Sequence, residues 1–206
     1  MKPLLIFDFD GTIADTKQVY YATISEELKK FKFSEKRVEK AIDIGLSLKK
    51  TLGKLGINWI ISLYLRKRIN KNVEKQLKQI KKCKDASSIK TIKQDKILVT
   101  NSLKEFAIPI LKHLRLKKSF KAIFGAEDFS DKAEFIKSYL TKNNILRQDC
   151  FYIGDRVADI KVARQVGCKS VIIAGKCAWD SRKEILKHSP DFIIDDLKSI
   201  QEILGN

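Results

Sequence analysis

The chain has 206 residues, of which 44% are hydrophobic and 33% charged, a composition typical of a folded globular protein and not of a disordered one. No apolar stretch approaches the roughly 20 residues of a membrane span, and the first residues lack a basic and then apolar signal segment, so we expect a cytoplasmic protein without a membrane partner. The four cysteines are scattered without a CxxC pair, and two histidines are present. This pattern argues against a structural zinc site and against a disulfide framework, and predicts reduced, mostly buried thiols.

The formal net charge of +17 raises the question of a nucleic-acid partner. Residues 15–93 contain 21 lysines and arginines against 8 acidic residues, so this segment carries +13 of the total. It lacks the interleaved aromatic residues of single-strand binders, and it contains no known DNA-binding motif. A nucleic-acid partner is therefore an alternative that we do not favour. A basic segment would equally steer small anions.

The first half of the chain predicts one strand followed by helices. A continuous apolar run over residues 3–9 is typical of a strand buried in a parallel sheet. Helical periodicity follows over residues 16–31, with Thr16 as the N-cap. Residues 15–84 show no strand pattern. We expect the aromatic residues Phe31, Trp59 and Tyr64 to pack inside this segment. Further helices are predicted over about 35–46, 48–55, 59–69 and 72–82.

The second half alternates short apolar runs with amphipathic segments. Strands are predicted over 96–102, 122–128, 150–155, 170–175 and 192–195. Helices are predicted over 103–116, 132–144 and 157–167, and a last helix closes the chain. Such alternation indicates an α/β fold, a doubly wound, mainly parallel, Rossmann-like sheet. Residues 1–14 and 94–206 would form this core, and residues 15–93 would be a helical insert after the first strand.

Polar residues follow several of the predicted strands. In open α/β sheets, ligands bind beyond the carboxyl ends of the strands, so segments distant in the sequence should meet there. Gly11 would let the chain turn sharply, so that two acids one residue apart face one ligand. The side chains expected at this edge are those of Asp8, Asp10, Thr100, Asn101, Lys132, Asp155 and Asp159.

These residue types form a coherent chemical set. Carboxylates such as Asp8, Asp10 and Asp155 can hold Mg²⁺, which prefers oxygen ligands. Asp8 can attack phosphorus and form an aspartyl phosphate, while Lys132 offsets the charge repulsion. Backbone N–H groups and a hydroxyl can bind the phosphate oxygens. The phosphate-binding positions are then Gly11, Thr100, Asn101 and Lys132.

The segments "DFDGT", "TNS", a single "K" and "GDRVAD" occur in this order and resemble the four motifs of the haloacid dehalogenase superfamily. The chain is most similar to its phosphoglycolate-phosphatase-like branch, whose helical cap follows the first strand. The resemblance implies that Asp8 is the nucleophile and a Mg²⁺ ligand. It also implies that Asp10 is the general acid and base and that its backbone carbonyl oxygen is a ligand of Mg²⁺.

The resemblance further implies that Thr100 and Lys132 bind phosphate and that Asp155 is the remaining protein ligand of Mg²⁺. Asp159 would support the metal shell from outside it. Since the proline that often follows the motif lysine is missing here, Lys137 is an alternative to Lys132.

These inferences predict a Mg²⁺-dependent phosphomonoesterase that hydrolyses a small organic phosphate, such as phosphoglycolate, a sugar phosphate or a nucleotide. Asp10 favours this activity over dehalogenation, which does not need a second acid. The alternatives are a protein that binds nucleic acid or acts on its ends, and a phosphonatase or phosphotransferase on the same core. Both a monomer and a homodimer are compatible with the sequence.

Overall fold

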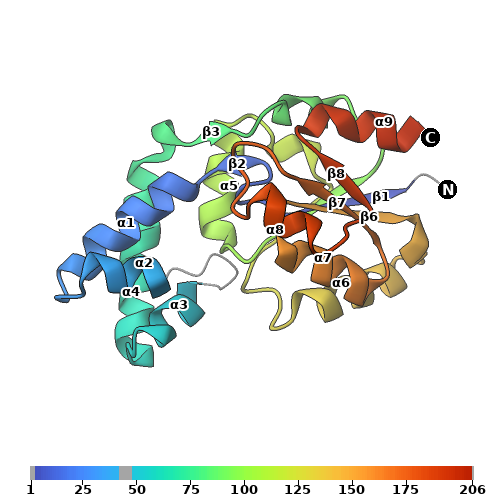
Figure 1. Ribbon diagram of the computed structural model, residues 1–206. Helices are drawn as coiled ribbons and strands as arrows, with labels where there is room; N and C mark the ends of the chain where they lie inside the picture. Colours follow the sequence, from blue (N-terminus) through green and yellow to red (C-terminus); the bar gives the residue numbers. More distant parts are fainter. Residues whose placement is uncertain (1–2, 42–47, 206) are drawn as a thin grey trace. The chain divides into compact units, whose positions relative to one another are not determined.

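The computed structural model describes residues 3–41 and 48–205 (Figure 1). The chain divides into two compact units. The α/β unit comprises residues 1–15 and 81–206, and the helical unit comprises residues 16–80. Residues 81–93, which we expected in the insert, therefore fall in the α/β unit. They are held there by contacts that no local pattern encodes, including a hydrogen bond of 2.9 Å from the Gln201 side chain to the Thr91 hydroxyl.

The α/β unit contains one six-stranded sheet in the order β5-β4-β1-β6-β7-β8, and all its neighbouring strands are parallel. This confirms the predicted α/β fold. The strands are β1 (Leu4–Phe7), β4 (Lys96–Val99), β5 (Ala122–Phe124), β6 (Cys150–Gly154), β7 (Lys169–Ile173) and β8 (Phe192–Ile194). The α-helices are α5 (Lys104–His113), α6 (Lys132–Lys142), α7 (Val157–Val166), α8 (Arg182–Leu186) and α9 (Ile200–Gly205). Single 3-10 turns are η2 (Ala86–Lys90), η3 (Lys117–Ser119), η4 (Arg147–Asp149) and η5 (Leu197–Ser199).

Helices cover both faces of this sheet, and the side chains of its central strands β1, β4 and β6 are therefore buried on both sides. On one face, Ile6 of β1 lies in a core cluster with Ile136 of α6 and Ala163 of α7. Figure 1 shows α6 and α7 side by side along this face. On the other face, the Phe9 ring beyond β1 contacts Phe106 of α5, with centroids 6.4 Å apart. The chain moves outward from β1 to β4 and β5 and then returns to β6 on the other side of β1. Such a reversal creates a crevice beside β1 at the carboxyl ends of the strands.

A second, two-stranded sheet contradicts the expectation that residues 15–84 contain no strand. Strand β2 (Ala14–Asp15) pairs antiparallel with β3 (Lys81–Lys82). Each strand has two residues, which is too short for an alternating pattern to appear in the sequence. The pairing joins the two points where the chain leaves and re-enters the α/β unit.

The helical unit consists of α1 (Lys17–Lys29), α2 (Glu35–Ala41), α3 (Leu48–Lys54), α4 (Trp59–Lys75) and the 3-10 turn η1 (Leu77–Gln79). The separate helix predicted over 72–82 is wrong, because α4 continues to Lys75 and residues 81–82 form β3. The part of the predicted 35–46 helix beyond Ala41 lies outside the described residues.

The aromatic residues of the helical unit do not form its core. Trp59 is 74% exposed, Tyr64 is 53% exposed and Phe31 is 39% exposed, which corrects our expectation that these three pack inside. Aliphatic side chains fill the core instead, among them Leu28 of α1 and Leu65 and Ile69 of α4. In the described part of the chain, no helix combines the length and apolarity required to cross a membrane.

Candidate active site

The segment that follows β1 leaves the sheet through a tight loop. Asp8 is still held against β6, since its backbone N–H donates to the Ile153 carbonyl at 2.8 Å. The chain then turns back, and the Gly11 N–H donates to the Ala14 carbonyl at 2.9 Å. Gly11 has a φ of +77°, and any side chain there would collide with Trp179 and Asp155. Glycine is therefore required at this position both by the backbone and by the space around it.

Three carboxylates meet at the carboxyl edge of the sheet, beside the point where the strand order reverses. Ligand oxygens of Asp8, Asp155 and Asp159 all lie within 4.8 Å of one another. The three residues come from the ends of β1 and β6 and from the first turn of α7. All three are buried, with 8%, 0% and 4% of their surface exposed, respectively.

Local and long-range contacts together orient the two acids that follow β6. A side chain at Gly154 would collide with the Asp159 carboxyl group, so the glycine allows Asp159 to fold back over the strand end. There Asp159 accepts hydrogen bonds of 3.1 Å from the backbone N–H groups of Asp155 and Arg156. Asp155 in turn accepts from the Thr12 hydroxyl at 2.9 Å and from the Trp179 N–H at 2.7 Å.

Lys132 is the first residue of α6 and lies against Asp8. Its Nζ donates to Asp8 Oδ1 at 2.8 Å and to the Tyr152 hydroxyl at 3.1 Å, and the lysine is 9% exposed. Asp131 begins the helix by accepting from the Glu134 N–H at 2.9 Å, which places Lys132 in the first turn. The alternative, Lys137, instead pairs with Glu134 on the helix surface. The structure therefore brings Lys132, and not Lys137, to Asp8.

The segment after β4 supplies a partner for the second acid of the first motif. The Ser102 hydroxyl donates to Asp10 Oδ2 at 2.6 Å. Thr100 is 1% exposed, and its hydroxyl accepts from the Ser102 N–H at 3.0 Å, which fixes the turn between them. Asn101 is exposed at the tip of this turn.

Four residues of this arrangement were not among those we selected from the sequence: Thr12, Ser102, Tyr152 and Trp179. Thr12 and Ser102 lie inside the quoted motifs, so the sequence does indicate their hydroxyl groups as candidate site groups. Tyr152 looks like an ordinary strand residue and is fully buried. Trp179 follows β7, and no local pattern indicates that its backbone N–H donates to the Asp155 carboxylate. The sequence carries no signal for either residue.

Two carboxyl groups of this cluster, those of Asp155 and Asp159, have raised pKa values. Burial raises the pKa of Asp155 well above its usual range, and the neighbouring charges of Asp159 and Asp8 add to this shift. Burial and the Asp8 charge raise the pKa of Asp159 to about 7, although Lys132 and Arg156 act in the opposite direction. A hard divalent cation would compensate the clustered negative charge that adds to the effect of burial on the pKa values of Asp155 and Asp159. Asp8, Asp155 and Asp159 could together hold such a cation, and their oxygen atoms are ligands of the kind that Mg²⁺ prefers.

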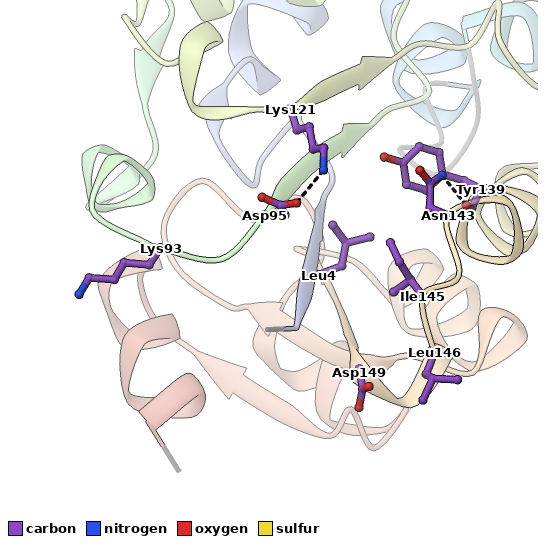
Figure 2. A pocket seen from close by; sticks show the side chains of 9 residues that line it. All are labelled: Leu4, Lys93, Asp95, Lys121, Tyr139, Asn143, Ile145, Leu146 and Asp149. Carbon is purple, nitrogen blue, oxygen red and sulfur yellow. Dashed lines mark hydrogen bonds and ion pairs between the residues drawn. The ribbon is translucent and has the colours of Figure 1, made fainter. Parts of the chain in front are cut away.

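A cavity of about 530 Å³ lies elsewhere in the α/β unit. Figure 2 shows its lining, which includes Leu4 at the start of β1, Asp95 before β4 and Asp149 before β6. These positions are at the amino ends of the strands, the opposite edge from the carboxylates. An exposed ion pair of 2.8 Å between Lys121 and Asp95 crosses part of it. The cavity is therefore distinct from the candidate site.

The fold and the site together define a class of protein, a parallel α/β protein with buried carboxylates and a lysine at the switch point of its sheet. A family model described as "Haloacid dehalogenase-like hydrolase" matches residues 5–173. The chain belongs to this family, as the resemblance of its motifs implied.

Individual relatives are distant. The chain is 27% identical over 111 residues to a phosphoglycolate phosphatase of Salmonella choleraesuis, an alignment that covers 52% of this chain and 43% of that protein. The chain thus spans under half the length of this relative. It is 26% identical over 209 residues to PpaX of Caldanaerobacter subterraneus, provisionally named a pyrophosphatase, with 97% and 93% of the two chains covered. The crystal structure of a hydrolase from Pseudomonas syringae has the same fold, with a TM-score of 0.79, 21% identity, and coverage of 98% and 97%.

Proposed function

We propose that the protein is a Mg²⁺-dependent phosphatase that hydrolyses a small phosphate monoester through an aspartyl phosphate on Asp8. The observation that carries this proposal is the contact between Asp8 and Lys132 inside a buried cluster with Asp155 and Asp159. A carboxylate held by one cation and surrounded by further acids has the composition of a site for phosphoryl transfer.

In the first step, a carboxylate oxygen of Asp8 attacks phosphorus, and the bond from phosphorus to the ester oxygen breaks. Lys132 aligns Asp8 before attack and offsets the negative charge of the phosphate when it arrives. Asp10 donates its proton to the departing oxygen, so that an alcohol leaves. The Ser102 hydroxyl, 2.6 Å from Asp10, fixes the direction of that carboxyl group.

In the second step, water attacks the phosphorus of the aspartyl phosphate while Asp10 takes up its proton. The bond between Asp8 and phosphorus breaks, and inorganic phosphate and free Asp8 are released. Asp10 has then returned to its protonated form, so the cycle closes without another proton carrier. Thr100 and the N–H groups near Gly11 and Asn101 are the donors that we assign to the phosphate oxygens.

Asp8, Asp155 and the Asp10 backbone carbonyl would hold Mg²⁺, and Asp159 would orient Asp155 from behind. When bound, the cation supplies charge compensation between the anionic nucleophile and the anionic phosphate. The helical unit is the cap that the family resemblance implies, and we assign substrate selection to it. Phosphoglycolate and pyrophosphate are suggested by the names of the relatives, and sugar phosphates and nucleotides are equally compatible with the site.

A phosphate-release screen tests this proposal. The purified chain is assayed with phosphoglycolate, sugar phosphates, nucleoside monophosphates, pyrophosphate, a phosphonate and a 5′-phosphorylated oligonucleotide, each with Mg²⁺ or with EDTA. We expect Mg²⁺-dependent release from at least one small monoester, and loss of this release in Asp8→Asn. The matched control is Asp95→Asn, a surface aspartate, which should keep full activity. Turnover by a folded Asp8→Asn protein would refute the nucleophile, and a preference for the oligonucleotide would favour the nucleic-acid alternative.

A further inference from the structure

The loop between β7 and α8, residues 174–181, contacts the segment after β6 at two consecutive positions. The backbone N–H of Trp179 donates to Asp155 Oδ2 at 2.7 Å. The next residue, Asp180, accepts through its Oδ2 from the backbone N–H of Val157 at 2.9 Å. These two hydrogen bonds attach the β7–α8 loop to the segment that begins with Asp155 and enters α7.

The Asp180 carboxylate is suited to this contact because Val157 is the first residue of α7. The N–H groups of the first helical turn have no acceptor within the helix, and a negative charge near them is favourable. Asp180 therefore gains both a hydrogen bond and an interaction with the helix dipole. Its side chain is 22% exposed, and its ion pair with Arg156 is long, at 3.8 Å. The hydrogen bond from Val157 is the stronger of the two attachments.

The Trp179 N–H is a backbone group, so its position depends on the path of the β7–α8 loop. The ring of Trp179 occupies the space where a side chain at Gly11 would lie, and the Arg156 guanidinium lies over this ring, 5.9 Å from its centroid. Asp180 fixes the chain one residue beyond Trp179. Because the two residues are adjacent, a shift of the backbone at Asp180 changes the distance from the Trp179 N–H to its acceptor.

The acceptor, Asp155, depends on its hydrogen bonds because it is fully buried, with 0% of its surface exposed. The Thr12 hydroxyl donates to its Oδ1 at 2.9 Å, and the Trp179 N–H donates to its Oδ2 at 2.7 Å. Each carboxylate oxygen keeps a further lone pair beyond the one that accepts such a bond. The two donors therefore set the direction in which the remaining lone pairs of Asp155 point.

We propose that Asp180 is a positioning residue for the Mg²⁺ site, and that it acts on Asp155 through the Trp179 N–H. This inference rests on the proposed function, in which Asp155 is a ligand of the cation. Groups that orient a metal ligand raise the affinity for the metal, and their removal typically costs about 10–100-fold in affinity. Asp180 acts through the loop and not on Asp155 itself, so its removal should cost about tenfold, the lower end of this range.

Calorimetric titration of the metal-free chain with MgCl₂, in the absence of substrate, tests the role of Asp180. We expect Asp180→Ala to bind Mg²⁺ about tenfold more weakly than wild type. Asp180→Asn keeps an oxygen that can accept from the Val157 N–H, and it should stay within about threefold of wild type, since the long ion pair with Arg156 contributes little. Equal losses of affinity in the two variants would contradict a role of this hydrogen bond and overturn the proposal.

Asp191→Ala is the matched control, because Asp191 makes similar bonds at the opposite edge of the sheet. It accepts from the Ser170 N–H at 2.8 Å and from the Ser170 hydroxyl at 2.6 Å, and it thereby joins the amino ends of β7 and β8. Asp191→Ala should lower the free energy of unfolding in urea and leave the Mg²⁺ affinity within about twofold of wild type. A loss of affinity equal to that of Asp180→Ala would show that Asp180 acts only through overall stability.

The Mg²⁺ dependence of phosphate release separates this inference from the proposed function. In Asp180→Ala, the Mg²⁺ concentration for half-maximal release should rise about tenfold, and excess Mg²⁺ should recover most of the lost rate. A rate that excess Mg²⁺ does not recover would contradict the role of Asp180. If wild type binds no Mg²⁺, the proposed cation site and this role fall together. If wild type binds Mg²⁺ and releases phosphate but Asp180→Ala titrates identically, the role of Asp180 alone is refuted.

Discussion

At the scale of single residues, Lys132 and Lys137 provide a direct comparison on one helix. Lys132 lies 2.8 Å from Asp8, whereas Lys137, five positions later, pairs with Glu134. We expect Lys132→Met to reduce kcat/KM by about 10²–10³-fold, because a positioned cation next to the reacting phosphate is lost. Lys137→Met should change kcat/KM by less than about twofold, since surface ion pairs contribute little. Steady-state kinetics of the two variants show which lysine supports the reaction, and equal losses of kcat/KM would contradict the assignment of Lys132.

Ser102 offers a second prediction at this scale, because its hydroxyl is 2.6 Å from Asp10 Oδ2. This bond fixes the direction of the Asp10 carboxyl group, so its removal in Ser102→Ala should reduce kcat by about tenfold with little change in KM, the equivalent of one hydrogen bond to a charged group. Ser102→Thr keeps the hydroxyl and should restore most of the rate. Steady-state kinetics check this prediction, and full kcat in Ser102→Ala would contradict the positioning of Asp10 by Ser102.

At the scale of elements, the buried Glu27 joins α1 to α4. It is 1% exposed and accepts hydrogen bonds from Lys30 at 2.6 Å, from Arg68 at 2.8 Å and from Asn72 at 2.8 Å. Burial opposes its ionisation, but these bonds outweigh burial and lower the pKa of Glu27. We expect Glu27→Gln to reduce the free energy of unfolding by about 1–2 kcal/mol at pH 7, since its cationic partners remain hydrated.

Urea unfolding as a function of pH tests this prediction about Glu27. Because the folded pKa is below the unfolded one, the stabilisation is present above the unfolded pKa and is lost as the pH falls through the folded pKa. The gap between wild type and Glu27→Gln should therefore close in acid. Glu26→Gln is the matched control, because Glu26 is the exposed neighbour on the same helix. An equal effect of both changes would show that Glu27 acts only through the net charge of α1.

The same scale shows what local sequence could and could not reveal. The strand that precedes Asp8 and the helix that begins at Lys132 were predictable, because each is marked by its apolar pattern and by polar residues at its end. Strands β2 and β3 were not, since each has two residues and its partner lies more than 60 positions away. Sequence reports the periodicity within an element, whereas these contacts depend on how distant elements meet.

At the scale of the whole molecule, the carboxylate cluster should link folding to pH and to the Mg²⁺ that we propose. The pKa of Asp159 rises to about 7 in the folded chain, and that of Asp155 also rises. The folded state therefore binds protons more tightly than the unfolded state, whose carboxyl groups have ordinary values. The sign follows from this difference: the stability of the metal-free protein is highest below the unfolded pKa and declines as the pH rises through about 7.

Thermal unfolding between pH 6 and pH 8 with EDTA tests this linkage, because ordinary carboxylates are ionised throughout that range. We expect Tm to fall toward pH 8 in wild type and to change less in Asp159→Asn, which keeps an oxygen to accept the N–H groups of Asp155 and Arg156. Saturating Mg²⁺ should raise Tm by about 5–10 °C at pH 8 and by less at pH 6, where protons compete for the same oxygens. Asp155→Asn should abolish the Mg²⁺ effect. A Tm that rises equally with Mg²⁺ at both pH values, or that still responds in Asp155→Asn, would place the cation elsewhere in the molecule.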